Sequence, residues 1–441
     1  MGQNLPPRPE TAGEGVREAR PDRTRLWWVA LGALAVASAS LSAYVAVRYA
    51  GDPPYFGDQW FYLRLAREWR AGDGLTTSAE ISAGYPLFVA LVDLARSTSV
   101  LRPDLVVSVG IVQSVLSGVT VALTGVLGRR VAGPAVGLAA AATLALWPNV
   151  VVGAAVVLSE PLATLLGVMV VLALVWERQP STARILVAGA VLGLAVEVRP
   201  GSLALLVLFL AMPAGGSWRR RLRSLALGGG VVLLVVLPFA LRSSYVTRSF
   251  VPFDLRAGSS LCLGRLPEAD GGPIDFERCP YTSGASAVEA NRERLERAAQ
   301  LLRDHPGREP RLMVGRMDAT LWASDRSGID ELNSRDGQDL DQRLSDRLAG
   351  LSTFWSRVVV VLALVGTAGA VARRRRGVSI AAAAGWLLLT IPLVSLGDPR
   401  FRVPSLPFLA IAAGSLLNLR RRRPEMPDPL SPSEGSVGSL L

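Results

Sequence analysis

The chain contains no lysine, so all 47 of its basic residues are arginine. It has a single histidine, His305, and two cysteines, Cys262 and Cys279. One histidine gives little support to a zinc site or to a serine–histidine triad. No glycine-rich loop of the phosphate-binding type occurs, which argues against a nucleotide-driven pump. Carboxylates and arginines therefore become the main candidates for carrying chemistry.

Long apolar runs dominate the sequence: 50% of the 441 residues are hydrophobic and the mean hydropathy is +0.35. Runs of about 20 residues recur, and each is long enough to cross a hydrocarbon core roughly 30 Å thick. A transmembrane β-barrel would instead show short segments of alternating hydrophobicity. The sequence therefore predicts an all-α polytopic membrane protein with about ten transmembrane helices, interfacial helices and a small extracytoplasmic helical cap.

The net charge of +11 would suggest nucleic-acid binding if the arginines were spread over one soluble surface. They cluster instead in every second loop between apolar runs, and basic loops of this kind stay in the cytoplasm. Both termini are then inside. The predicted spans are 26–47, 104–127, 134–148, 161–176, 185–198, 201–213, 225–241, 353–372, 378–396 and 403–419.

The remaining segments follow from this topology. We expect the tails 1–25 and 420–441 to be cytoplasmic and disordered. Ser38-Ala39-Ser40 resembles a signal-peptide cleavage site, but the apolar run is long for one, which favours an uncleaved anchor. The apolar stretch Tyr85 to Ala95 is too short to cross the membrane and is expected to be re-entrant or interfacial.

Two outer loops stand out. The transmembrane core 26–241 contains the first, 48–103, and the second is the large loop 242–350, which precedes the C-terminal helices 351–419. Apolar positions at helical spacing predict one helix over 288–303 and another near 311–322 in the large loop, which would form the cap. Both cysteines lie there. A disulfide fits an oxidising compartment, although two cysteines alone do not prove a pairing.

Asp58 is the first candidate for chemistry. It opens a helix-like run, Trp60 to Arg70, in which aromatic residues alternate with arginines as in an interfacial helix. Asp58 would be either the N-cap of that helix or a general base within reach of an acceptor hydroxyl at the membrane surface. The two roles are compatible, because a cap holds its carboxylate in a fixed orientation.

Glu160 and the outer arginines form the second group of candidates. Glu160 stands at the head of an apolar span, where it would interact with the helix dipole or support the base. Arginines are rare in short outer loops, so those at span ends need a reason. Binding the phosphate of a lipid carrier is one, and pairing with Asp58, Glu160 or anionic lipid headgroups is the other. The arginines concerned are Arg199, Arg242, Arg248, Arg400 and Arg402.

The order of these motifs resembles the GT-C superfamily of integral membrane glycosyltransferases, especially its protein O-mannosyltransferase and aminoarabinose-transferase branch (glycosyltransferase family 39 type). In that family an acid followed closely by a tyrosine lies in the first outer loop. The matching segments are Gly57-Asp58-Gln59-Trp60-Phe61-Tyr62, Ala83-Gly84-Tyr85-Pro86, Leu158-Ser159-Glu160-Pro161, Arg199-Pro200, Leu237-Pro238-Phe239-Ala240-Leu241-Arg242 and Gly397-Asp398-Pro399-Arg400-Phe401-Arg402-Val403-Pro404. Two positions depart from the family pattern: Gln59 stands where a second acid is common, and Ser243 where asparagine is common.

The resemblance implies a polyprenyl-phosphate-linked sugar donor and an inverting displacement on the extracytoplasmic face of a bacterial plasma membrane. Asp58, supported by Glu160, would accept the acceptor's proton. Tyr62, Tyr85 and the arginines at 199, 242, 400 and 402 would bind substrate. The resemblance implies no cofactor and no bound metal, although a divalent metal is not excluded. The acceptor would be a glycan, lipid or protein, and nucleic acid is not expected as a partner.

Two other classes of protein compete with this interpretation. A transporter or flippase for a lipid-linked or anionic substrate would place ionisable groups near the bilayer midplane, often between repeated halves. A non-catalytic lipid-binding subunit would explain the arginines but not Asp58. The enzyme hypothesis requires residue 58 and the turn 397–402 to share one face of the membrane.

Overall fold

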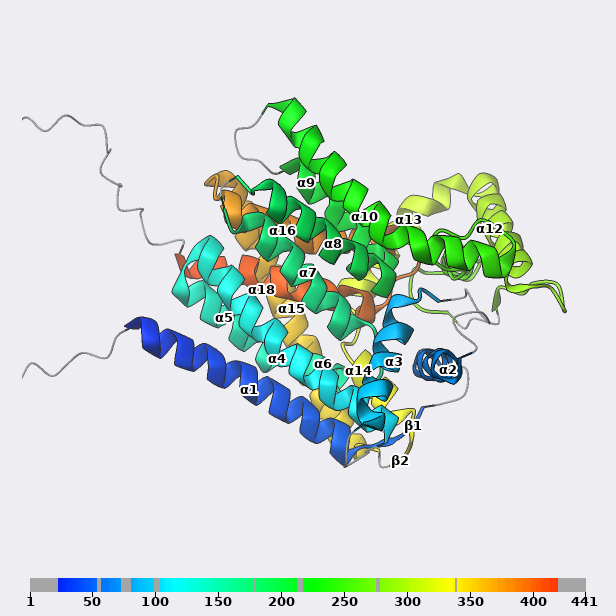
Figure 1. The fold of residues 1–441 in the computed structure, drawn as a ribbon, viewed down its shortest axis with the longest axis horizontal. Helices are drawn as coiled ribbons and strands as arrows, with labels where there is room; N and C mark the ends of the chain where they lie inside the picture. Colours follow the sequence, from blue (N-terminus) through cyan, green and yellow to red (C-terminus); the bar gives the residue numbers. More distant parts are fainter. Residues whose placement is uncertain are drawn as a thin grey trace, which may run out of the picture.

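The computed structural model describes residues 23–53, 57–72, 81–98, 104–177, 179–211, 217–274, 278–337 and 339–418. In this part of the chain nearly all regular structure is helical (Figure 1). The one sheet described there pairs β1 (Gly51–Asp52) with β2 (Asp336–Gly337) in an antiparallel ladder. The expected all-α fold is therefore confirmed. The expected tails 1–25 and 420–441 lie outside the described residues, apart from positions 23–25.

Each predicted span corresponds to a helix or to a run of short helices. Within the described residues, six of these are long and apolar enough to cross a membrane, and shorter apolar helices accompany them. The spans are α1 (Arg23–Arg48), α4 (Leu105–Ala132), α5 (Pro134–Ala145), α7 (Glu160–Val175), α8 (Thr182–Val198), η2 with α9 (Pro200–Val207, Leu208–Ala211), α10 (Trp218–Thr247), α15 (Gln342–Ala372), α16 with α17 (Arg376–Leu388, Thr390–Val394), and η5 with α18 and η6 (Pro399–Ser405, Leu406–Gly414, Ser415–Asn418).

Local sequence explains where these helices begin, end and meet. The Asp104 carboxylate accepts a hydrogen bond from the Val106 amide at 2.7 Å and caps α4. The α4–α5 turn needs Gly133, whose φ of +101° is unfavourable for residues with a side chain. Small residues let the helices approach: a Cβ on Gly118 would lie 2.7 Å from the carbonyl oxygen of Ala35. Helices α1, α4 and α5 therefore pack closely.

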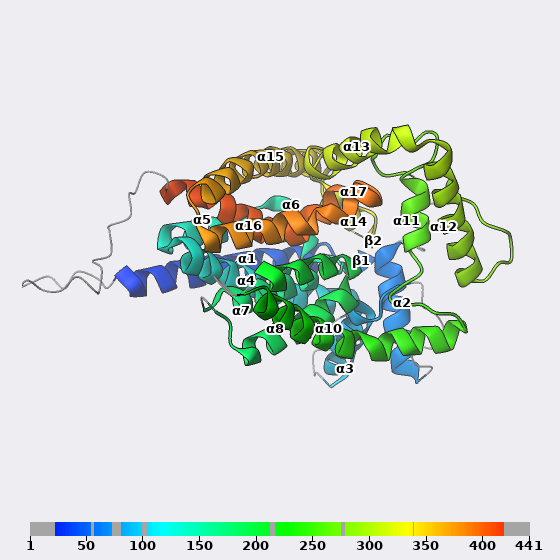
Figure 2. The same ribbon diagram turned by 90° about the horizontal axis from the view of Figure 1, so that it is seen from above.

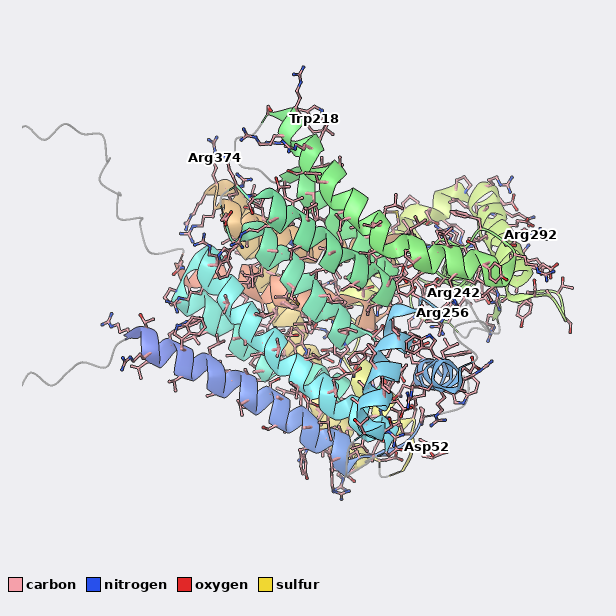
Figure 3. The ribbon with its side chains drawn as sticks, viewed as in Figure 1. Asp52, Trp218, Arg242, Arg256, Arg292 and Arg374 are labelled. Carbon is pink, nitrogen blue, oxygen red and sulfur yellow. A yellow bond between two sulfur atoms is a disulfide. The ribbon has the colours of Figure 1, made fainter. Side chains whose placement is uncertain are left out.

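The two ends of the bundle differ in character. The start of α1 and the turn at Arg374 lie at one end (Figures 1 and 3). The opposite end carries α2 (Asp58–Ala71), α3 (Gly84–Ser97) and the elements of the large loop, and Figure 2 shows the same separation from above. Basic turns and predicted outer loops therefore occupy opposite ends, as the charge pattern requires.

The large loop forms the expected helical cap. It contains α11 (Ala257–Leu263), α12 (Ala287–Asp304), the 3₁₀ turn η4 (Pro306–Arg308), α13 (Glu309–Leu321) and α14 (Ser327–Asn333). Helix α14 contacts α6 (Pro148–Gly153), a short helix of the bundle. Helices α12 and α13 match the predicted stretches 288–303 and 311–322 within a few residues.

Two kinds of bond hold the cap together and to the bundle. Cys262 and Cys279 form a disulfide. Glu309 accepts bonds from Arg265 at 2.6 Å and from the fully buried Arg316 at 2.7 Å. Arg316 also donates to the carbonyl of Leu393 in α17 at 2.7 Å. The cap is thereby fixed against the end of a predicted membrane span.

Candidate active site

Asp58 is the first residue of α2, and Gly57 occupies the N-cap position. No side-chain capping bond is present there, so the N-cap role expected for Asp58 is wrong. One carboxylate oxygen lies 2.6 Å from Nη1 of Arg256, and the other lies 2.9 Å from Nη2 of Arg400. Both oxygens of the carboxylate bond to guanidiniums and not to the backbone amides at the start of α2. Charge-assisted bonds to guanidiniums are stronger than bonds to backbone amides.

Arg400 connects the acids of this region. Besides Asp58, its guanidinium lies 3.2 Å from Glu160 and 3.4 Å from Glu331 of α14. Its backbone amide donates to the Asp398 carboxylate at 2.7 Å, which caps η5. The Gly-Asp-Pro-Arg turn thus fixes the direction in which Arg400 leaves the backbone, and residue 58 and the turn 397–402 do share one face.

Glu160 is the first residue of α7, and its side chain is almost fully buried. It lies 2.6 Å from Nη1 of Arg199, the residue that ends α8 before Pro200. The Arg199 guanidinium also stacks on the ring of Phe401, 5.1 Å from its centroid. Arg199 therefore makes the ion pair with Glu160 that the sequence offered as an alternative to phosphate binding.

We call the six side chains joined by these ion pairs the charged cluster. Its acids are Asp58, Glu160 and Glu331, and its cations are Arg199, Arg256 and Arg400. Sequence reasoning identified four of them and missed Arg256 and Glu331, which both lie in the large loop. The only hint was the surplus of charged residues in that loop.

Gln59, the departure from the family pattern, is fully buried beneath the cluster. Its amide nitrogen donates to the backbone carbonyl and the carboxylate of Glu331, at 2.9 Å and 3.0 Å. Its amide oxygen accepts from Arg335 at 2.8 Å and from the Val157 amide at 3.3 Å. A single neutral side chain therefore satisfies both an acid and a cation while joining α2 to α14.

The two tyrosines lie in the wall of the site. Tyr62 donates to Ser159 at 3.5 Å, and its ring meets that of Tyr85 edge to face at 4.5 Å between centroids. Tyr85 is fully buried and donates to the side-chain oxygen of Gln113. Burial, helped by the nearby Asp58 charge, raises the pKa of Tyr62 to about 12, so its hydroxyl stays protonated.

Arg402 and Arg242 lie outside the charged cluster. Arg402 is fully buried, 2.8 Å from Asp325, and donates to the Thr320 carbonyl at 2.7 Å. Arg402 thus has an ion-pair partner in Asp325, and its phosphate contact stays a prediction. Arg242 lies in the last part of α10, and Figure 3 shows its label close to that of Arg256.

Electrostatics set the state of the acids outside the membrane spans. Burial alone would raise the pKa of Asp58, but the guanidiniums of Arg400 and Arg256 outweigh it and hold that pKa well below its ordinary value. For Glu331 burial prevails over Arg400, and its pKa is raised. Asp58 is therefore a stable anion while the arginines remain beside it.

A small cavity of about 50 Å³ opens next to the cluster. Glu160 and Arg400 supply the charged part of its lining, and apolar or small side chains supply most of the rest. These residues include Val121, Leu144, Val150, Ala154, Leu158, Pro161, Val403, Leu406 and Pro407. The cavity therefore places apolar walls beside one guanidinium and one carboxylate. In the described residues, no group of three or more potential metal ligands occurs.

No protein-family model matches the sequence, and no curated protein matches it either. Solved structures do. The oligosaccharyltransferase AglB from the archaeon Archaeoglobus fulgidus, in complex with an inhibitory peptide and a dolichol-phosphate, aligns over 90% of this chain and 51% of its own, with 12% identity and a TM-score of 0.50. The same enzyme tethered to an acceptor peptide aligns over 89% and 49%, with 12% identity and a TM-score of 0.51.

ArnT from Cupriavidus metallidurans, bound to undecaprenyl phosphate, aligns over 89% of this chain and 77% of its own, with 14% identity and a TM-score of 0.43. The chain spans about half the length of the archaeal enzyme. At 12% identity the similarity to AglB is one of fold. The chain therefore has the GT-C membrane fold that its sequence motifs predicted.

Proposed function

We propose that the protein is a membrane glycosyltransferase that moves a sugar from a polyprenyl-phosphate carrier to a cell-envelope acceptor. We place the reaction at the extracytoplasmic face of a bacterial plasma membrane, where the charged cluster lies opposite the basic turns. The observation that carries the proposal is Asp58, an anion held by two guanidiniums, of which Arg400 also lines an apolar cavity. The fold match adds support, because the AglB structure contains a dolichol-phosphate, which is a lipid phosphate.

The reaction is a single displacement at the anomeric carbon. The acceptor oxygen forms a bond to that carbon, its proton passes to Asp58, and the bond between the carbon and the phosphate oxygen breaks. The electron pair goes to the phosphate, which leaves with the lipid. General-base assistance of this kind is worth ~10²–10⁴-fold in rate. Preorganised guanidiniums at the departing phosphate supply a further part of the acceleration.

The same arginines have two possible partners in this mechanism. In this structure Arg256 and Arg400 bond to Asp58 and keep its basicity low. Donor phosphate oxygens offer equivalent acceptors for guanidinium forks. When the phosphate draws the guanidiniums away, the cause of the low pKa is removed and Asp58 becomes a stronger base. Donor binding thereby prepares the base for the acceptor.

The placement of charge favours this function over a transporter or flippase. Glu160 begins α7, Arg199 follows the end of α8 and Arg400 lies in the first turn of η5. A transport site would be expected near the middle of the spans. Charges at helix ends on one face suit chemistry at the membrane surface.

The test compares Asp58→Asn with Asp52→Asn, a matched change at the exposed strand β1. Full-length protein in lipid nanodiscs is given a labelled polyprenyl-phosphate sugar and a cell-envelope extract. We expect transfer to fall by at least ~10²-fold in D58N and to stay unchanged in D52N. Donor binding should survive in D58N. Full transfer by a folded D58N would refute the base assignment.

A further inference from the structure

A second acid pair lies next to the charged cluster. Glu197 belongs to the last turn of α8, and only 3% of its surface is exposed. Its Oε1 atom has no hydrogen-bond partner among the described residues. Leaving a buried carboxyl oxygen unpaired is costly, so such a group marks a place where a ligand can supply the missing bond.

Close packing fixes the position of Glu197. A Cβ on Gly84, at the start of α3, would lie 2.6 Å from the backbone carbonyl carbon of Glu197. Glycine at position 84 therefore allows α3 to press directly against this turn of α8.

Asp254, in the segment between α10 and α11, is the acid that acts electrostatically on Glu197. Its oxygens accept from the Ser82 hydroxyl at 3.0 Å and from the Arg256 backbone amide at 3.1 Å. Burial raises the pKa of Asp254 above its ordinary value, despite those bonds. The two acids thus lie in one site that is largely shielded from water.

Each acid of the pair lies close in sequence to an arginine of the charged cluster. Asp254 precedes Arg256, which holds Asp58, by two residues, and Glu197 precedes Arg199, which holds Glu160, by two residues. The pair and the charged cluster are therefore held by the same two short segments.

The chemistry of the pair selects its ligand. Two carboxyls offer a phosphate no cation, and no group of three or more metal-ligating side chains occurs in the described residues. Carboxyl oxygens are strong acceptors for hydroxyl donors. We propose that Glu197 and Asp254 form a subsite that binds the hydroxyl groups of a sugar ring, next to the reacting centre. This inference rests on the proposed function and adds a sugar-binding element to it.

The experiment uses full-length protein in nanodiscs and the variants Glu197→Gln and Asp254→Asn, with Glu296→Gln on the exposed face of α12 as the control. Binding is measured for bare polyprenyl phosphate, for polyprenyl-phosphate-linked hexose and pentose, and for soluble oligosaccharides as acceptor probes. We expect both subsite variants to bind bare polyprenyl phosphate as the wild type does. They should bind one of the sugar-bearing probes at least about tenfold more weakly.

The probes distinguish the source of the sugar. Weaker binding of the sugar-linked lipids alone assigns the subsite to the donor, and weaker binding of the oligosaccharides alone assigns it to the acceptor. Unchanged binding of every probe, or equal loss for bare and sugar-linked lipid, overturns the subsite. If wild-type protein binds no polyprenyl phosphate, the proposed function itself fails. Thermal unfolding of each variant shows that it is folded. One folded variant suffices to compare probe binding with that of the wild type.

Discussion

Arg400 contacts Asp58 and Glu160 at the same time, at 2.9 Å and 3.2 Å. The two acids belong to α2 and α7, which are about a hundred residues apart in sequence, so one guanidinium sets their spacing. A flat, multidentate guanidinium can bond to several oxygens in fixed directions, whereas an ammonium group is a point charge.

Replacing Arg400 by lysine should therefore be damaging although it keeps the charge. We expect Arg400→Lys to lower transfer by ~10²-fold or more, since a directed donor at the leaving group is lost. Arg292→Lys, on the exposed face of α12, is the matched control and should have no effect (Figure 3). Transfer rates with labelled donor lipid measure both. Wild-type rates in R400K would remove Arg400 from the mechanism.

The low pKa of Asp58 predicts a specific loss of stability in acid. A carboxylate with a folded-state pKa below its unfolded value stabilises the fold fully above the unfolded pKa, and this contribution disappears as the pH falls through the folded one. The unfolded value is near 3.8. The unfolding midpoint of wild type should exceed that of D58N by a constant amount between about pH 5 and 7.

That difference should shrink as the pH is lowered below about 4. Glu331 is present in both proteins, and burial, the largest cause of its raised pKa, acts in both. Thermal unfolding followed by intrinsic tryptophan fluorescence at each pH provides the measurement. A difference that grows in acid would mean that Asp58 is not stabilised by its arginines.

Restoring the acid common in the resembling family should harm this protein. In Gln59→Glu, a carboxylate would replace the amide that donates to the Glu331 carbonyl and carboxylate. Like charges would then face each other in a buried site, and we expect destabilisation of about 1–3 kcal/mol. Gln300→Glu on the exposed face of α12 is the control, measured by denaturant or thermal unfolding. Equal stability of Q59E and wild type would contradict this account of Gln59.

The sequence was informative where physical rules act locally. Hydropathy and the arginine pattern predicted the spans, because membrane insertion depends on length, apolarity and the placement of basic residues. The same statistics drew attention to Arg199 and Arg400, since short outer loops rarely carry arginine. Both proved to contact predicted acids.

The contacts that the sequence did not predict depend on tertiary structure. Arg256 lies in a long loop that was predicted to be outside, where arginine carries no statistical penalty and therefore no signal. Arg400 and Arg402 share one short motif, yet the tight turn of η5 directs the first to Asp58 and the second to Asp325. The role of Gln59 likewise required knowing that α14 folds back against α2.

The charged cluster contains equal numbers of acids and guanidiniums, so its formal charge in the empty state is zero. A sugar-linked lipid phosphate is a diester with one negative charge, whereas the spent carrier is a monoester with about −1.5 to −2. In the proposed reaction, the acids would therefore hold down the affinity for the more highly charged product. Balanced charge of this kind favours release of the spent lipid and repeated turnover over a single tight capture.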